Sequence, residues 1–421
     1  MKVVIVGAGH AGGSAASLLK ASGFAGEIVL IGAEPVAPYQ RPPLSKAWLK
    51  GEADLESLLL RPDTYYAEQG IDLRTGVVAN AISPADHTVT LSDGTVEPYD
   101  ALILATGSTG RRLPIPGADR PDLIELRTIA DAERLKAQLG PGCRLVIVGG
   151  GYIGLEAAAS ARGLGAEVIL LERLDRVLKR VASEPLSAFF TERHRAAGVD
   201  IRLNVEVAGF EDGGVRLSDS SLVGADVILV GVGALANDGL ARAAGLACDP
   251  AGSGGIIVDE MARTSDAAIY AIGDVTVRPV PAHGCTMRLE SVPNALEQAR
   301  QAAHAIVGRA QAAPEVPWFW SDQYDIKLQI AGLPQEADRT VVRGDPATGR
   351  FAVFHLYGDR IVCVEAVSAP PEFMAGKQLI GRRTPVDVAR LADPAVSMKA
   401  VGQGATGQAQ GCSPASDGSS R

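Results

Sequence analysis

Two glycine-rich segments with the same spacing constrain the fold of this chain more than any other feature of its sequence. The first is Gly7-Ala8-Gly9-His10-Ala11-Gly12, and the second is Gly149-Gly150-Gly151-Tyr152-Ile153-Gly154. In both segments glycines occupy the first, third and sixth positions, directly after a short apolar run. This pattern predicts a strand, a tight turn and a helix whose N-terminus can face an anion.

Each segment is followed by a second apolar run and then an acidic residue. Residues 28–31 precede Glu34 in the first unit, and residues 168–171 precede Glu172 in the second. In a Rossmann-type unit the glycines admit a pyrophosphate, and the acid accepts hydrogen bonds from a ribose diol. One such segment can be an ordinary tight turn. Two complete units predict two bound dinucleotides, as in a flavin reduced by a nicotinamide.

Composition narrows the class of protein further. The 421 residues include 40 basic and 49 acidic side chains, so the net charge of −9 argues against non-specific nucleic-acid binding. Five cysteines, with no closely spaced pair, argue against a secreted disulfide framework, and no metal site is predicted. An apolar strand beginning at residue 3 leaves no room for a signal peptide, and no apolar run approaches roughly 20 residues. We therefore expect a cytoplasmic protein without a membrane span.

The order of the predicted elements indicates several domains. A β-meander is predicted over residues 77–100, with Ser92-Asp93-Gly94 as a hairpin turn, and a further strand over residues 264–274 has Asp274 at its carboxyl end. After Trp318 the short β runs are residues 328–331, 340–343, 351–356 and 361–367, followed by a helical segment near 371–382. Residues 402–421 are rich in Gly, Ser, Gln and Ala and are predicted to be disordered.

Motifs spread over nearly the whole chain resemble one known family. They are the two glycine segments, Tyr39-Gln40-Arg41-Pro42-Pro43-Leu44-Ser45-Lys46, Leu126-Arg127-Thr128, Ala271-Ile272-Gly273-Asp274, Glu290-Ser291-Val292-Pro293-Asn294-Ala295 and Pro317-Trp318-Phe319-Trp320-Ser321-Asp322-Gln323. The sequence resembles the FAD-dependent ferredoxin reductases of bacterial aromatic-ring dioxygenase and cytochrome P450 systems. The resemblance implies a glutathione-reductase-like α/β fold, with two Rossmann-type dinucleotide-binding domains and a C-terminal α+β domain.

The resemblance also implies domain boundaries and an activity. The FAD-binding domain would be discontinuous, covering residues 1–109 and 237–313, around an NAD-binding domain at 110–236. A C-terminal domain at 314–401 and a disordered tail at 402–421 would follow. Electrons would pass from NADH to FAD, and then singly to a [2Fe-2S] ferredoxin that feeds a P450 or a Rieske-type oxygenase. Which of the two oxygenases is served stays open.

Expected FAD contacts come from several segments. By the resemblance, Glu34 binds the adenosine ribose, Arg41 reaches the diphosphate and Asp274 accepts from the ribityl hydroxyls. The other expected FAD contacts are Gly7, Gly9, His10, Ala11, Gly12, Lys46, Ala79, Arg127 and Val292. For Glu34 and Arg41 the alternative is an ordinary solvated surface charge.

Expected NADH contacts lie in the second unit. The Glu172 carboxylate would accept hydrogen bonds from both ribose hydroxyls and repel a 2′-phosphate. This predicts a preference for NADH over NADPH. The nearby Arg180 leaves some tolerance of NADPH possible. The other expected NADH contacts are Gly149, Gly151, Tyr152, Ile153, Gly154, Glu156 and Gly233.

Lys46 and Glu156 are the predicted chemical pair. Hydride transfer between two bound cofactors depends mainly on positioning, and a lysine near the reactive flavin nitrogen can stabilise negative charge. Glu156, five residues after Gly151, would lie deep in the cleft and order Lys46. The alternative is that Glu156 only complements the dipole of its helix.

Trp320 is the third predicted catalytic residue. By the resemblance it lies beside the flavin on the face turned to the ferredoxin, and Arg300 and Lys399 belong to the same docking surface. Ferredoxins of this type are commonly acidic, so basic residues would steer association in a salt-dependent way. The alternatives are interior packing for Trp320 and scattered solvated charges for Arg300 and Lys399.

Three other classes of protein compete with this interpretation. A disulfide reductase needs a reactive cysteine in its first domain, and residues 1–142 contain none. The same absence of a cysteine argues against an NADH oxidase with this fold. An apoptosis-inducing-factor-like binding protein would need basic or docking tracts that this acidic chain does not show.

Overall fold

The computed structural model describes residues 1–402, so the tail predicted to be disordered lies outside the described residues except for Gly402. The chain divides into two compact units, residues 1–327 and the part that begins at Leu328. Helices and sheets are mixed throughout, which confirms the predicted α/β class. Within residues 1–402, no helix has both the length and the apolar character needed to cross a membrane.

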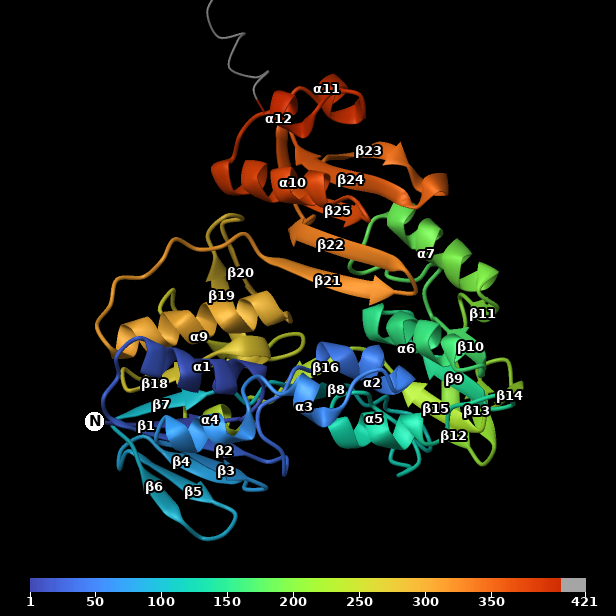
Figure 1. The fold of residues 1–421 in the computed structure, drawn as a ribbon. Coiled ribbons are helices and arrows are strands. Elements are labelled where there is room, and N and C mark those ends of the chain that lie inside the picture. The colour runs from blue at the N-terminus through green and yellow to red at the C-terminus, as the bar shows by residue number, and fades with distance from the viewer. Residues whose placement is uncertain (403–421) are drawn as a thin grey trace, which may run out of the picture. The chain divides into compact units, whose positions relative to one another are not determined.

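A five-stranded parallel sheet forms the core of the first unit. Its strands, in spatial order, are β18 (Ile269–Ala271), β7 (Ala101–Leu104), β1 (Lys2–Val6), β2 (Glu27–Gly32) and β3 (Ile71–Thr75). Both faces are covered, so alternate residues of one strand enter different cores. Val3 and Ile5 pack with helices α1 (His10–Ala21) and α9 (Val292–Ile306), whereas Val4 and Val6 pack on the opposite side (Figure 1).

An antiparallel meander covers that opposite face. It consists of β4 (Ala79–Ser83), β5 (Thr88–Leu91) and β6 (Val96–Pro98), which confirms the β-meander predicted over residues 77–100. The strand predicted over residues 264–274 is much shorter, since only Ile269–Ala271 forms β18. The Thr264 N–H donates to the Ile269 carbonyl at 2.9 Å, so the chain turns back before the strand begins. Asp274 follows in the short helix η2 (Gly273–Val275).

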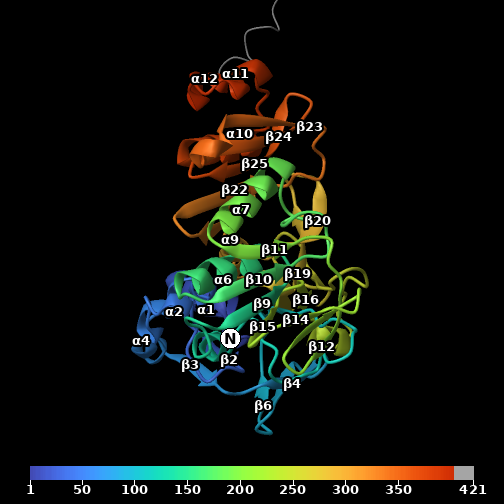
Figure 2. The ribbon, with the colours of Figure 1, turned by 90° about the vertical axis from the view of Figure 1, so that its right-hand side faces the viewer.

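The second glycine segment belongs to a separate parallel sheet. Its strands, in order, are β11 (Val199–Arg202), β10 (Glu167–Leu171), β9 (Arg144–Val148) and β15 (Val227–Val230). Helices α6 (Tyr152–Gly163) and α7 (Glu184–Ala196) lie on one side of it (Figure 2). On the other side, Val146 and Val148 pack against the meander of β12 (Val207–Glu211), β13 (Gly214–Leu217) and β14 (Leu222–Gly224).

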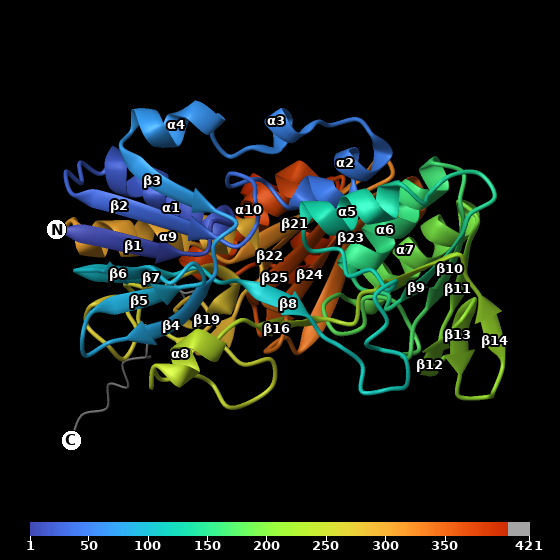
Figure 3. The same cartoon turned by 90° about the horizontal axis from the view of Figure 1, so that it is seen from below.

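The chain passes between these two sheets twice. The outward segment is β8 (Ser108–Gly110) and the return segment is β16 (Ala234–Ala236), and the two pair antiparallel (Figure 3). The remaining elements of the first unit are η1 (Pro42–Ser45), α2 (Ala47–Lys50), α3 (Leu55–Leu58), α4 (Asp63–Glu68), α5 (Ile129–Lys136), α8 (Gly239–Ala243), β17 (Ile256–Ile257), β19 (Thr276–Val280), β20 (Cys285–Arg288) and β21 (Trp318–Gln323).

The second unit contains the four short β runs predicted within residues 328–367. Its strands run in the order β22 (Ile326–Gly332), β25 (Arg360–Val367), β24 (Arg350–Tyr357) and β23 (Arg339–Asp345), with η3 (Pro346–Thr348) between β23 and β24. The helix predicted near residues 371–382 is confirmed as α10 (Pro370–Arg382). The buried Arg343 donates to the carbonyls of Leu391 and Val396, which holds α11 (Val388–Ala392) and α12 (Met398–Val401) in place.

Candidate dinucleotide-binding and electron-transfer site

The two glycine turns have the same geometry. Gly7 and Gly149 have φ values of +112° and +109°, a region that disfavours residues with a side chain. A Cβ at Gly12 would lie 1.9 Å from the Gly7 carbonyl oxygen, and a Cβ at Gly154 would lie 2.4 Å from that of Gly149. These four glycines are therefore needed so that each helix can approach its strand.

The middle glycine of each turn has a different role. A Cβ at Gly151 would meet no atom within 4 Å, and one at Gly9 would meet only the Arg41 guanidinium at 3.8 Å. Neither helix has a side-chain cap at these positions, so the first backbone N–H groups are available to a ligand. The space in front of each helix N-terminus thus fits the pyrophosphate of a dinucleotide.

The first turn carries a further sign of an absent ligand. The Nδ1 atom of His10 is buried and has no hydrogen-bond partner in the described structure. Burial, with the charge of Arg41 as a second cause, lowers the pKa of His10 to about 4, so the ring is neutral. An unpaired buried polar atom is costly unless a bound group satisfies it, so this turn fits FAD.

Both predicted ribose acids lie at the ends of their strands and are already hydrogen-bonded. Glu34 accepts from Arg41 and from the Tyr39 hydroxyl, both at 2.6 Å. Glu172 accepts from the Gly150 N–H at 2.7 Å and from the Leu174 N–H at 2.8 Å. Each carboxylate oxygen can accept a second bond, so these contacts fix the carboxylates without preventing contact with a diol.

Arg41 links the segment after strand β2 to the segment that holds Arg127. Besides Glu34, its guanidinium donates to the Arg127 carbonyl, and Tyr39 accepts from the Ile129 N–H at 3.0 Å. Arg127 lies 3.7 Å from Asp274 and donates to Ser108. Arg41, Arg127 and Asp274 are therefore connected through side chains on three separate segments.

Lys46 and Glu156 form an ion pair, in which Glu156 is buried and Lys46 is partly buried, although 110 positions separate them in sequence. Glu156 Oε2 accepts from Lys46 Nζ and from Ser45 Oγ, both at 2.6 Å, and Oε1 accepts from Ser321 Oγ at 2.6 Å. The Glu156 side chain is only 3% exposed. A buried carboxylate is tolerated when charged and neutral donors satisfy it, as they do here, so Glu156 holds Lys46 in one place.

The other predicted site residues have diverse surroundings. Tyr152 packs edge to face on Phe319 at 4.8 Å, Ile153 is exposed, and Trp320 has its ring 5.8 Å from that of Trp318. Ala79 begins β4 and Val292 begins α9. The Arg180 guanidinium lies 3.8 Å from the position of a Cβ at Gly233. Ala11 is buried in α1.

The predicted docking residues are not all in one unit. Arg300, on α9, is 41% exposed and lies 3.8 Å from Glu315. Lys399 is exposed on α12 of the second unit. An exposed pair of this kind contributes about 0–1 kcal/mol, so Arg300 remains able to pair with a partner.

Sequence reasoning missed several polar residues around the site. Ser45 and Ser321 bind Glu156, and Arg288 donates to the Asp274 carbonyl at 3.1 Å while pairing with Glu290 at 2.5 Å. Burial raises the pKa of Glu290. Ser45, Glu290 and Ser321 lie inside motifs that carry the family resemblance. That resemblance is the one signal that could have identified them.

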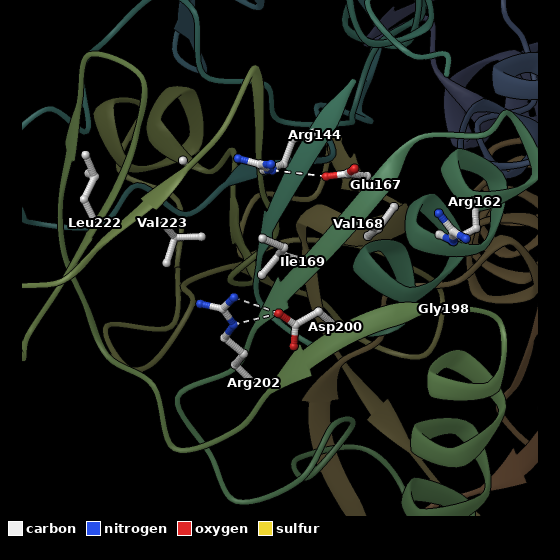
Figure 4. A pocket seen from close by; sticks show the side chains of 11 residues that line it. Arg144, Arg162, Glu167, Val168, Ile169, Gly198, Asp200, Arg202, Leu222 and Val223 are labelled. Carbon is white, nitrogen blue, oxygen red and sulfur yellow. Dashed lines mark hydrogen bonds and ion pairs between the residues drawn. The ribbon is translucent and has the colours of Figure 1, made fainter. Parts of the chain in front are cut away.

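A cavity of about 440 Å³ has no residue of either glycine turn in its lining. Figure 4 shows the side chains that line it. The first residues of β9 and β10 line it, with parts of β11 and β14, whereas the glycine turn follows the carboxyl end of β9. Its arginines Arg144 and Arg202 are paired with Glu167 and Asp200. It is not the dinucleotide site. The residues up to 402 also contain no group of side chains suited to a metal ion.

Family models match both units. Residues 1–299 match the pyridine nucleotide-disulphide oxidoreductases and residues 318–402 match the reductase C-terminal family. A probable ferredoxin reductase, CtmF, of Castellaniella defragrans is 50% identical over 95% of this chain and 98% of its own length. The ferredoxin reductase subunit of a 5,5′-dehydrodivanillate O-demethylase from a Sphingobium species is 44% identical, over 94% of this chain and 97% of its own.

A solved structure agrees with these matches. The covalent putidaredoxin reductase–putidaredoxin complex has a chain that is 44% identical, with a TM-score of 0.93 over 97% of this chain and 99% of that one. The chain therefore belongs to the ferredoxin reductases of the pyridine nucleotide-disulphide oxidoreductase family. It is an FAD-dependent oxidoreductase that uses NAD(P)H.

The contrast between Gly151 and Gly163 tests the second turn. Both glycines lie on or before α6, and a Cβ at either would meet nothing within 4 Å. We expect Gly151→Ala to leave the fold and the flavin content unchanged and to raise the KM for NADH about tenfold, because the methyl group occupies the pyrophosphate space. The matched Gly163→Ala variant should keep the KM of the unchanged enzyme. Equal KM values for the two variants would contradict the placement of the pyrophosphate.

Proposed function

We propose that this chain transfers electrons from NADH, through bound FAD, to a [2Fe-2S] ferredoxin that serves an oxygenase of the P450 or Rieske type. The observation that carries the proposal is the repeated glycine geometry within one unit, together with the ion pair that joins the segment after the first turn to the helix after the second. The reaction is NADH plus two oxidised ferredoxins giving NAD⁺, two reduced ferredoxins and one proton. Bound FAD supplies the conversion from a two-electron donor to a one-electron acceptor.

The residues of this chain bind, orient and provide charge. The first turn with Glu34, Arg41 and Asp274 holds FAD, and the second turn with Glu172 holds NADH. Lys46 presents a positive charge that Glu156 keeps fixed at 2.6 Å, which places an electrostatic stabiliser in the site without reorganisation during the reaction. The 18% exposure of the Lys46 side chain keeps water from screening that charge fully.

The domain boundaries inferred from the family resemblance are part of the proposal. The pairing of β8 with β16 supports boundaries near 109/110 and 236/237, because the chain crosses between the two sheets there. We also infer a cytoplasmic location, since Cys143, Cys248 and Cys363 are free thiols, the form kept in reducing compartments.

The ferredoxin partner is proposed to dock near Trp320 and Arg300, which both belong to the first unit. Lys399 belongs to the second unit and stays a prediction from the family resemblance. The exposed guanidinium of Arg300 supports attraction of an acidic partner.

The Glu172 carboxylate is proposed to set the preference for NADH. The substitution Glu172→Gln should lower the ratio of kcat/KM for NADH to kcat/KM for NADPH at least about tenfold, because the carboxylate no longer repels the 2′-phosphate. The measurement is steady-state kinetics with both nucleotides and a small-molecule electron acceptor. Glu167→Gln removes a carboxylate from the other end of the same strand and should leave the ratio unchanged. An unmodified enzyme that used NADH and NADPH equally well would refute this role.

The ferredoxin half-reaction should depend on Trp320 and Arg300, and flavin reduction should not. In stopped-flow measurements, Trp320→Ala should change the rate of flavin bleaching by NADH less than about twofold and slow ferredoxin reduction at least about tenfold. Arg300→Glu should weaken ferredoxin association most at low salt, where screening is least. Arg112→Glu is a matched control, because Arg112 also forms a loose exposed pair, 3.9 Å from Glu125. Slower flavin bleaching with unchanged ferredoxin reduction would overturn the docking assignment.

A further inference from the structure

A buried row of polar side chains extends from Glu156 to helix α7. Ser321 Oγ lies 2.6 Å from Glu156 Oε1, and Gln323 Nε2 lies 3.2 Å from Ser321 Oγ. His194 Nε2 lies 2.8 Å from Gln323 Oε1, and the Tyr324 hydroxyl lies 3.0 Å from His194 Nδ1. Ser321, Gln323 and His194 are at most 1% exposed. Three hydrogen bonds therefore connect the ion pair of the site to His194 on helix α7, and a fourth connects His194 to Tyr324.

Regular structure brings these residues together. Phe319, Ser321 and Gln323 alternate along β21, so they share one face of the strand. Phe319 meets Tyr152 and Ser321 meets Glu156, and those two partners are four residues apart on one face of α6. The strand thus lies along the helix with matched polar and aromatic positions, and the row is built on rigid elements.

The carboxylate at one end fixes the direction of every bond in the row. Glu156 Oε1 can only accept, so the Ser321 hydroxyl donates to it and must accept from the Gln323 amide nitrogen. The Gln323 oxygen then faces His194, which must carry its proton on Nε2. Nδ1 is left as an acceptor for the Tyr324 hydroxyl. All donors point toward Glu156, so each bond polarises the next in the same sense.

The two titratable members keep these roles over a wide pH range. Burial lowers the pKa of His194 to about 4, opposed by the bond to Gln323 and aided by the charge of Arg193, so the ring stays neutral. Burial raises the pKa of Tyr324 to about 12, so its hydroxyl stays a donor. At the outer end, Arg193 stacks 5.5 Å from the Tyr324 ring centre and pairs with Asp325 at 2.7 Å.

We propose that Ser321, Gln323 and His194 are positioning residues that act through Glu156 to hold the Lys46 ammonium in its working place. The proposal rests on the proposed function of the Lys46–Glu156 pair. The amide of Gln323 is a poor proton carrier, so the row orients a carboxylate and does not relay protons. Without the Ser321 donor, Oε1 would lose its partner and the carboxylate could rotate away from Lys46. Misplacement by about 1 Å can cost a reaction about a hundredfold in rate.

The first test compares two buried hydroxyls in the full-length, FAD-loaded enzyme. Ser321→Ala should lower the limiting rate of flavin reduction by NADH about tenfold and change the apparent Kd for NADH less than about twofold. Ser321→Thr keeps the hydroxyl and should restore most of the rate. Thr191→Val removes a buried hydroxyl of α7 outside the row and should keep the normal rate, whatever its effect on Tm. An unchanged rate in Ser321→Ala, or an equal loss in Thr191→Val, would overturn the proposal.

A second test does not depend on activity. Nitrogen-15 NMR of the imidazole groups in the unchanged holoenzyme should show His194 as a neutral ring with the proton on Nε2 from pH 6 to pH 8, with the resonance assigned by its loss in His194→Gln. A proton on Nδ1, or a charged ring, would contradict the directed row even if NADH reduces the flavin normally. Failure of NADH to reduce the flavin, with the Nε2–H form present, would instead contradict the proposed function.

Discussion

In two places a helix packs closely against the glycine turn that precedes it, and the position of both dinucleotide sites depends on this contact. At Gly12 and Gly154 there is no room for a single carbon atom beside the carbonyl oxygens of Gly7 and Gly149. This contact places each helix N-terminus at the carboxyl end of its sheet, where backbone N–H groups can meet a phosphate. Because both turns lie in one unit, the two dinucleotides they fit can be brought together by the same chain.

The ion pair of Lys46 and Glu156 joins the part of the first unit that holds the first glycine turn to the part that holds the second. Lys46 comes after strands β1 and β2 of the first sheet, and Glu156 lies on helix α6 after the second glycine turn. Their charged atoms are nevertheless 2.6 Å apart. A buried pair of this kind contributes little to net stability, because desolvation offsets the attraction. Its value is in position: three donors satisfy the Glu156 carboxylate and leave the lysine charge at one point in the site.

Local patterns predicted much of the fold and the two turns, because glycine spacing, apolar runs and hairpin residues act over a few positions. The meander at residues 77–100 and the helix at Pro370–Arg382 follow from such patterns. The strand leading to Asp274 was predicted too long, because a local hydrogen bond from Thr264 turns the chain first. Contacts such as Ser321 with Glu156, 165 positions apart, and His194 with Gln323, 129 positions apart, leave no periodic signal and required the structure.

The most direct test of the account is the electron balance of the complete reaction. Under anaerobic conditions, a known amount of NADH is added to a catalytic amount of the FAD-loaded enzyme with excess oxidised [2Fe-2S] ferredoxin, and reduced ferredoxin is measured by its visible spectrum. The account predicts two ferredoxins reduced for each NADH oxidised. Oxidation of NADH without ferredoxin reduction, or a bleached flavin that passes no electrons on, would contradict it.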